Sequence, residues 1–234
     1  LLELLVIAMR KELITSKKIH PDDTVVPVLE KNRKTTKQGR LWVYSNDTHI
    51  VYDYTPNRSR EGPKAFLLGY RGYLQADAYA GYNELVGKGK ATLVGCWAHA
   101  RRKFVEAKDS DPLRSHTALV FIGDLYRIER EWRAVDPETR AAVRQSVALP
   151  ILKKFETWLR EEAGRVLPKS PLGEAIRFAL NQWNSLIVYT QEGALDIDNN
   201  FAENAMRPVV LGRKNWLFAG NDSGGKRAAI IFSL

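Results

Sequence analysis

The pattern of apolar and polar positions divides the chain into a strand-rich part and a helix-rich part. Five apolar runs of strand length are rich in β-branched or aromatic residues: 24–29, 41–47, 49–55, 72–81 and 91–99. The first three runs, with the polar, basic turn "KNRKTTKQGR" at 31–40, predict an antiparallel meander. The later runs alternate with helical patches, which predicts crossover connections. We therefore expect a mixed α/β sheet with flanking helices.

Helical periodicity replaces the strand pattern after residue 104. Apolar residues recur every three or four positions in "TALVFIGDLYRIEREW", "ILKKFETWLREEA" and "LGEAIRFALNQWNSLIVYT", and prolines separate these segments. Four parts are predicted: a helical end at 1–18, the first part of an α/β core at 19–104, a helical insertion at 105–192, and a completion of the core at 193–234. Because the first residue is not Met and the last residues are apolar, we expect a piece of a longer protein, with 1–18 ending an upstream region.

The charge balance is strongly basic. Lys and Arg number 36 against 27 Asp and Glu, a net charge of +9. Such a surplus suggests a polyanionic partner, most simply nucleic acid, although a soluble protein that is merely basic has the same balance. The single cysteine excludes an intrachain disulfide and fits a reducing, intracellular compartment. No apolar window of about 18 residues exists, so no membrane-spanning helix is predicted.

Acidic residues in three settings are candidates for metal binding. Asp22 and Asp23 stand at the start of the first predicted strand, Asp77 stands in an otherwise uncharged run, and Glu203 lies in the first turn of a late helix. An acid in an apolar strand costs several kcal/mol of desolvation unless a charge, a hydrogen bond or a metal offsets it. Carboxylates are the ligands that Mg²⁺ prefers, and two such ions can act on one phosphodiester.

Each acid also has a structural explanation. The aspartates after Pro21 could simply begin a strand, and Asp77 could accept a hydrogen bond from the turn that follows it. "NFAE" at 200–203 has the spacing of a capping box, with Asn200 as the N-cap and Glu203 reaching back. Spacing alone does not separate these explanations from a metal site.

The segment "GCWAHARRKF" at 95–104 contains a second group of polar residues. Cys96 and His99 form a CxxH pair, but a structural zinc site needs about four ligands and the chain has no second cysteine. The pair is either packed at a strand end or a polar support for the acidic site. The cations that follow suit phosphate contacts or a solvated first turn of a helix: Arg101, Arg102 and Lys103.

A basic and aromatic stretch follows Glu203. Arg207 lies four residues on, on about the same face of the helix. Arg213 and Lys214 can contact a nucleic-acid backbone, and Trp216 can pack in the core or stack on a base. The patterns of a P-loop, of a GxSxG nucleophile and of an HExxH zinc site are all absent from the sequence.

Seven blocks of the sequence together resemble the transposases of the insertion-sequence-66 family, in that family's order over about residues 10–234. They are "IHPDDTVVPVL", "GRLWVYSND", "YDYTPNR", "GYLQADAYAGYNEL", "GCWAHARRKF", "IDNNFAENAMRPVVLGRKNWLFAG" and "GGKRAAIIFSL". The resemblance implies a ribonuclease H-like core with a DDE triad, two Mg²⁺ or Mn²⁺ ions, and DNA as substrate. It places the triad on Asp22, Asp77 and Glu203, and the family's CxxH on Cys96 and His99.

Two positions depart from the family pattern. Asp23 stands where the family usually has Glu, so the choice of Asp22 over Asp23 stays open, and Asn204 stands where an arginine usually follows the glutamate. The family's upstream DNA-binding and zinc-binding regions are not in this sequence.

The resemblance implies a transposase that cleaves and joins DNA for a bacterial insertion sequence. Its partners would be the DNA of the element ends and of the target. It would self-associate and act in the bacterial cytoplasm, at the nucleoid. Two alternatives are a catalytically inactive DNA-binding remnant and a ribonuclease H-like nuclease that cuts without joining.

Overall fold

The computed structural model describes residues 1–30 and 34–234, and it divides into two compact units. One unit consists of Leu1–Thr92 and Asn200–Leu234 and contains most of a β-sheet; the other is the helical segment Leu93–Asn199. The expected turn at 31–40 lies outside the described residues at 31–33, and strand β2 begins at Lys37.

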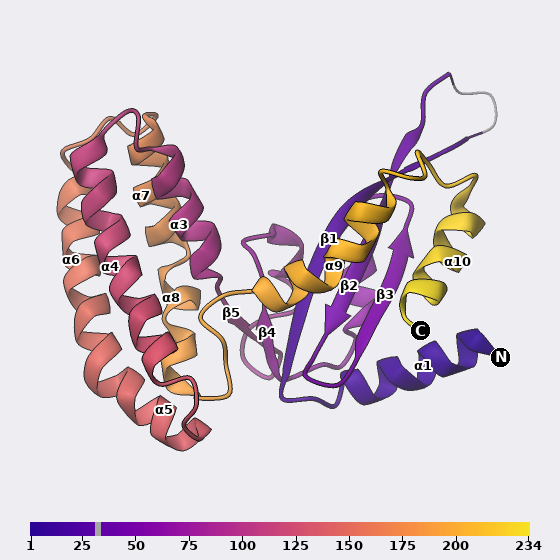
Figure 1. The fold of residues 1–234 in the computed structure, drawn as a ribbon, viewed down its shortest axis with the longest axis horizontal. Helices are drawn as coiled ribbons and strands as arrows, with labels where there is room; N and C mark the ends of the chain where they lie inside the picture. Colours follow the sequence, from indigo (N-terminus) through magenta and orange to yellow (C-terminus); the bar gives the residue numbers. More distant parts are fainter. Residues whose placement is uncertain (31–33) are drawn as a thin grey trace. The chain divides into compact units, whose positions relative to one another are not determined.

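Strands β1 to β4 of a five-stranded sheet form the centre of the first unit; the strand order of the sheet is β3-β2-β1-β4-β5 (Figure 1). Its strands are β1 (Lys18–Val28), β2 (Lys37–Ser45), β3 (Ile50–Thr55), β4 (Tyr73–Gln75) and β5 (Thr92–Val94). Strands β1, β2 and β3 pair antiparallel, whereas β4 pairs parallel with the first residues of β1. The expected mixed sheet is confirmed.

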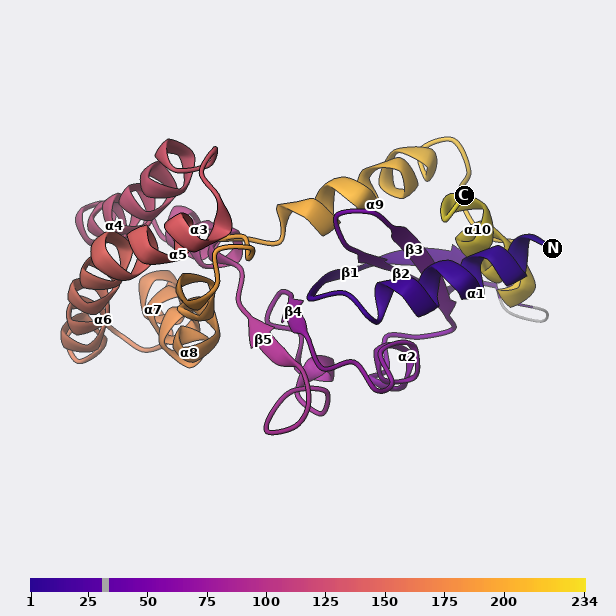
Figure 2. The ribbon, with the colours of Figure 1, turned by 90° about the horizontal axis from the view of Figure 1, so that it is seen from below.

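Two late helices cover one face of the sheet. Helix α9 (Asn200–Gly212) and helix α10 (Asp222–Phe232) pack their apolar residues on β1, β2 and β3. This core contains Val26, Val28, Leu41, Val43, Tyr52, Tyr54, Ala202, Ala205, Met206, Val209 and Ala229. Figure 2 shows α9 running along one side of these strands. The C-terminal segment therefore completes a core that the first third of the chain begins.

Aromatic residues cover the opposite face. Tyr44 stacks on Phe66, with ring centroids 3.7 Å apart, at the end of helix α2 (Glu61–Phe66). The ring centroids of Trp42 and Tyr79 are 5.8 Å apart, and Tyr79 directly precedes the short helix η1 (Ala80–Tyr82). The first helix, α1 (Leu2–Leu13), is joined to α2 because the Arg10 guanidinium donates to the Phe66 carbonyl.

The second unit is a bundle of helices. They are α3 (Trp97–Glu106), α4 (Pro112–Glu131), α5 (Pro137–Val143), the π-helical turn η2 (Arg144–Ala148), α6 (Leu149–Ala163), α7 (Pro171–Asn181), α8 (Trp183–Leu186) and η3 (Val188–Gln191). Three of them begin in the same way: a capping Asp or Ser accepts a backbone N–H and is followed by proline, at 111–112, 136–137 and 170–171. The helical prediction for this part is confirmed.

A buried arginine holds the end of the bundle together. Arg144 is 1% exposed and donates to the Glu129 carboxylate at 2.6 and 2.8 Å. It also donates to the carbonyls of Tyr189, Glu192 and Leu195 at 2.8–2.9 Å. Each N–H group of the guanidinium thus has an acceptor, which offsets the cost of burying its charge.

Several predicted boundaries are wrong. The first strand starts at Lys18 rather than 24, so the two aspartates lie within it, and the predicted strands 72–81 and 91–99 shrink to three residues each. The pairing of β4 with β1 is short, at Lys18 and Ile19, and β5 is short because α3 already begins at Trp97. Helix α3 packs on α4 and α7 and so groups with the helical unit; the four predicted parts of the chain stay a prediction.

Candidate active site

Strand β1 presents two neighbouring aspartates to opposite faces of the sheet. Successive side chains of a strand alternate between its faces. Asp22 shares the face of Val26, which packs in the core with α9, and of His20, whose ring lies 5.3 Å from that of Phe201 in α9. Asp23 points to the other face. Two residues that the sequence does not distinguish thus lie in different surroundings.

Asp23 is held by two arginines. Its side chain is only 4% exposed, and its Oδ2 accepts from Arg40 Nη1 at 3.0 Å. Its Oδ1 accepts from Arg58 Nη2 at 2.9 Å and from Arg58 Nε at 3.1 Å. Both oxygens are therefore engaged in charge-assisted hydrogen bonds, which are among the stronger ones in proteins.

Asp22 stands in a concentration of negative charge. Burial raises the pKa of its carboxyl to about 7; the Asp23 backbone N–H, which donates to its Oδ1 at 2.8 Å, opposes this rise. The charges of Asp77, Asp23 and Glu203 raise the pKa further. An ionised Asp22 is thus unfavourable until a cation joins the group.

Asp77 lies in the loop after β4, not within a strand. Its Oδ1 accepts the backbone N–H of Tyr79 at 3.1 Å, so the turn expected as the structural explanation is present. Its side chain is half-buried. This hydrogen bond engages Oδ1 and fixes where the carboxylate stands after the strand.

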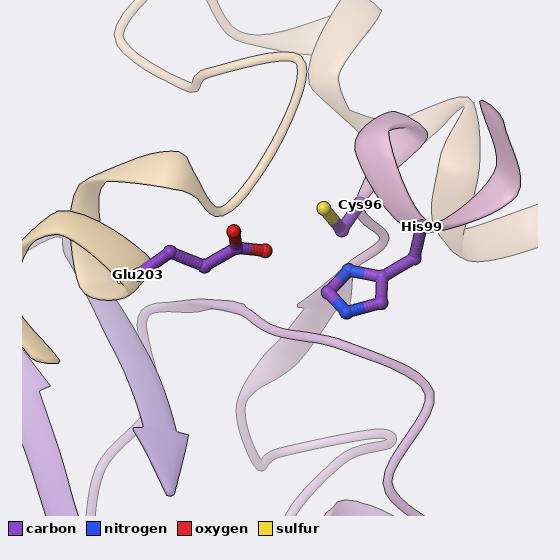
Figure 3. A group of neighbouring side chains, drawn as sticks. All are labelled: Cys96, His99 and Glu203. Atoms are coloured by element: carbon purple, nitrogen blue, oxygen red, sulfur yellow. The ribbon is translucent and has the colours of Figure 1, made fainter. Parts of the chain in front are cut away.

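Glu203 extends from the first turn of α9 (Figure 3) and is half-buried. The helix includes Asn200 as its first residue, and the predicted capping box stays a prediction. Because Glu203 contributes to the raised pKa of Asp22, its carboxylate lies within electrostatic range of β1. The fold therefore places Asp77 and Glu203, which come from two other segments, within electrostatic range of Asp22. Among the described residues, however, the carboxylate oxygens of these three do not all lie within 4.8 Å of one another.

Cys96 and His99 belong to the other compact unit, at the beginning of α3 (Figure 3). Cys96 is buried, and its Sγ accepts the backbone N–H of Asn199 at 3.2 Å. Burial raises the pKa of this thiol to about 11, so it stays protonated at neutral pH. The thiol thus packs within its own unit. A supporting role for the pair in the acidic site stays a prediction.

The predicted DNA-binding residues lie in different settings. Arg207 and Lys214 are exposed, and so are Arg101, Arg102 and Lys103 on α3 of the helical unit. Arg213 is half-buried, and its guanidinium donates to the Val25 carbonyl of β1. Trp216 packs against the sheet core and lines a cavity of about 360 Å³. The other predicted residues are exposed at the surface, with Lys103 also 3.3 Å from Glu106, whereas Arg213 and Trp216 also support the fold.

The sequence did not single out Arg40, Arg58 or Tyr79, which surround Asp23 and Asp77 in the structure. Along the chain, Asp23 is 17 positions from Arg40 and 35 positions from Arg58. The block "YDYTPNR" contains Arg58, and a cation just after a predicted strand was the available signal.

The comparisons with known proteins decide the family. The model of the Transposase IS66 family matches residues 1–227. This chain belongs to the IS66 transposase family. The match covers both compact units, so the helical segment is part of the family's domain.

The curated relatives are uncharacterised proteins of Sinorhizobium fredii (strain NBRC 101917 / NGR234). The protein y4hP is 33% identical over 94% of this chain and 44% of its own length. The protein y4qI is 33% identical over 93% of this chain and 43% of its own length. The protein y4jD is 31% identical over 93% of this chain and 46% of its own length. The IS66-family chain thus spans less than half the length of these relatives.

No solved structure matches the chain. Within the described residues, no helix combines the length and the apolar character needed to cross a membrane.

Proposed function

We propose that this chain forms the catalytic part of a DDE transposase, which cleaves DNA strands and transfers them with the help of divalent cations. One observation carries the proposal. Asp77 and Glu203, from two distant segments, lie in electrostatic range of Asp22: burial raises the pKa of Asp22, and the charges of these two acids raise it further.

The donor set fits hard divalent cations. Carboxylate oxygens are the preferred ligands of Mg²⁺ and Mn²⁺. In two-metal sites the ions lie about 3.5–4 Å apart, so three carboxylates would share two ions. When bound, the ions would supply the activation of water or of a 3′-hydroxyl and the stabilisation of the leaving oxygen.

The sheet supports the ribonuclease H-like fold that the family resemblance implies. The first three strands pair antiparallel and β4 pairs parallel with β1. The first acid lies on the central strand β1, the second follows the adjacent strand β4, and the third is on α9, which packs on β1. Strand ends and helix starts thus converge on the acids.

The chain's own residues would hold and orient the substrate. Asp22, Asp77 and Glu203 would hold the cations, while exposed Arg207, one helical turn beyond Glu203, would contact a phosphate. Lys214 extends the same positive segment. Asp23 takes no part as a ligand, because Arg40 and Arg58 already engage both of its oxygens.

The test is Mg²⁺-dependent cleavage of DNA that carries the element ends, with Asp77→Asn and Glu203→Gln as the variants. Each variant should lose cleavage, whereas Asp47→Asn, whose side chain is 74% exposed, should keep it. Undiminished cleavage by either site variant removes that residue from the site. A strand-transfer assay on the same samples separates a transposase from a nuclease, since the latter gives cut DNA without joined products.

A further inference from the structure

We propose that Arg58 and Tyr79 are positioning residues that hold Asp77 in place for cation binding, and that Asp23 is their anchor. The proposal rests on the proposed function, because it assigns a task to residues around one of its three acids. All four residues lie in the sheet unit, and all the contacts used below are within it.

Asp23 provides a rigid starting point. Strand β1 is paired with β2 at this position, where Asp23 lies opposite Trp42. The buried Asp23 carboxylate binds Arg58 through both Nε and Nη2, at 2.9–3.2 Å. Such a fork-shaped contact fixes the plane of the guanidinium as well as its position.

The fixed guanidinium in turn holds Tyr79. The Arg58 Cζ lies 4.5 Å from the centroid of the Tyr79 ring, within the range of a cation–π contact. The Tyr79 hydroxyl donates to the Arg58 carbonyl at 2.6 Å. The ring is thus joined to Arg58 at its face and at its hydroxyl.

Tyr79, held in this way, contacts Asp77 through its backbone. The Tyr79 backbone N–H donates to Asp77 Oδ1 at 3.1 Å. On the other sides, the Tyr79 ring packs at 5.8 Å from Trp42 and at 5.3 Å, edge to face, from Tyr82. A chain of direct contacts therefore leads from Asp23 in the sheet through Arg58 and Tyr79 to the loop carboxylate.

Gly81 makes room for the ring. A Cβ atom at this position would come within 2.1 Å of Tyr79 Cε1, so any other residue must displace the tyrosine. The short helix η1 that contains Gly81 thus keeps the ring against Trp42 and Arg58.

Arginine rather than lysine is required at position 58. A lysine ammonium cannot make the two-nitrogen contact with Asp23 while also stacking flat on an aromatic ring. The charge of Arg58 also interacts with Asp77 itself, so Arg58 lowers the cost of gathering carboxylates here.

The test is Mn²⁺ binding by isothermal titration calorimetry to the chain and to its variants. Arg58→Ala, Arg58→Lys and Tyr79→Leu should each weaken binding by about 10–100-fold, the usual effect of losing a partner behind a ligand. Tyr79→Phe keeps the ring on the guanidinium, so its affinity for Mn²⁺ should fall less than that of Tyr79→Leu. Arg60→Ala is the matched control, because its side chain is 60% exposed and two positions away.

Amide hydrogen exchange provides the second readout. Arg58→Ala should speed exchange at the Tyr79 N–H and across residues 76–82, while the core amides of β2 stay protected. A general loss of stability would instead speed exchange in β2 as well. Wild-type-like affinity or unchanged exchange at Tyr79 in Arg58→Ala overturns the positioning role. Absence of Mn²⁺ binding to the wild-type chain overturns the proposed function itself, and with it this inference.

Discussion

The carboxylates of Asp22 and Asp23, neighbours on strand β1, lie on opposite faces of the sheet. Asp23 is neutralised by Arg40 and Arg58, whereas Asp22 lies on the face of α9, where burial raises its pKa and the charges of other acids raise it further. Asp23 therefore stabilises the fold, whereas the ionised form of Asp22 destabilises it. The same dipeptide supplies a structural ion pair and a candidate ligand.

Asp22→Asn should stabilise the metal-free protein, and the gain should depend on pH. Because the pKa of Asp22 is raised in the fold, from 3.8 to about 7, its ionisation costs stability that is absent below about pH 4 and complete above about pH 7. The variant should gain about 1–3 kcal/mol at pH 8 and little at pH 4. Urea unfolding in EDTA at the two pH values measures this. An equal gain at both pH values contradicts the electrostatic explanation.

Mn²⁺ should raise the melting temperature of the wild-type chain but not that of Asp77→Asn or Glu203→Gln. A ligand at about 100 times its Kd stabilises the folded state by about 2.7 kcal/mol. Differential scanning fluorimetry with and without Mn²⁺ measures the shift. Asp47→Asn serves as the control, and an equal shift in all of these proteins would mean that the ion binds elsewhere.

Arg213→Ala and Lys214→Ala should separate folding from DNA binding. The Arg213 guanidinium donates to the Val25 carbonyl, so its loss should destabilise the fold by about 1–3 kcal/mol. Lys214 is exposed, so its loss should leave stability unchanged, weaken DNA binding, and reduce the salt slope of log K by about 1. Fluorescence anisotropy at several salt concentrations measures the latter. An unchanged slope in Lys214→Ala removes this residue from the DNA surface.

Cys96 should react slowly with iodoacetamide in the folded protein. Its thiol is buried, and its pKa is raised to about 11, so little thiolate is present at pH 8 and access is limited. Because the chain has a single cysteine, mass spectrometry reports on this one thiol. The unfolded chain in urea is the reference, and equal rates in the two states would disprove the packed environment.

Arg144→Met should destabilise the helical unit by about 3–5 kcal/mol, because it leaves the Glu129 carboxylate and three backbone carbonyls without their donor. Urea unfolding measures the loss. Arg177→Ala, whose side chain is 57% exposed and 3.7 Å from Glu174, should change stability by less than about 1 kcal/mol. Comparable losses in both variants would count against the buried network.

The fold class was predictable because it depends on local patterns. The β-branched runs and the helical periodicity identified the mixed sheet and the helical segment. The beginning of β1 was missed because Pro21, Asp22 and Asp23 interrupt its apolar pattern. What makes a charged Asp23 acceptable there is its ion pairing with Arg40 and Arg58, which come from later segments. No spacing along the chain reveals such a partner.

The candidate acids were predictable as residues but not as an arrangement. The choice between Asp22 and Asp23 depends on strand register, since a shift by one residue exchanges the two faces. The role of Tyr79 was hidden for a related reason. Its contacts with Arg58 and Trp42 are made by side chains from other segments, and only the turn with Asp77 is local.

The sheet unit is assembled from two separate pieces of the chain, Leu1–Thr92 and Asn200–Leu234. During synthesis, at about 5–20 residues per second, Glu203 therefore leaves the ribosome roughly ten seconds after Asp77. Until then the nascent chain has two of the three acids and lacks the helix that completes its core. A nascent or prematurely terminated chain thus lacks one of the three candidate acids and the helix that carries it.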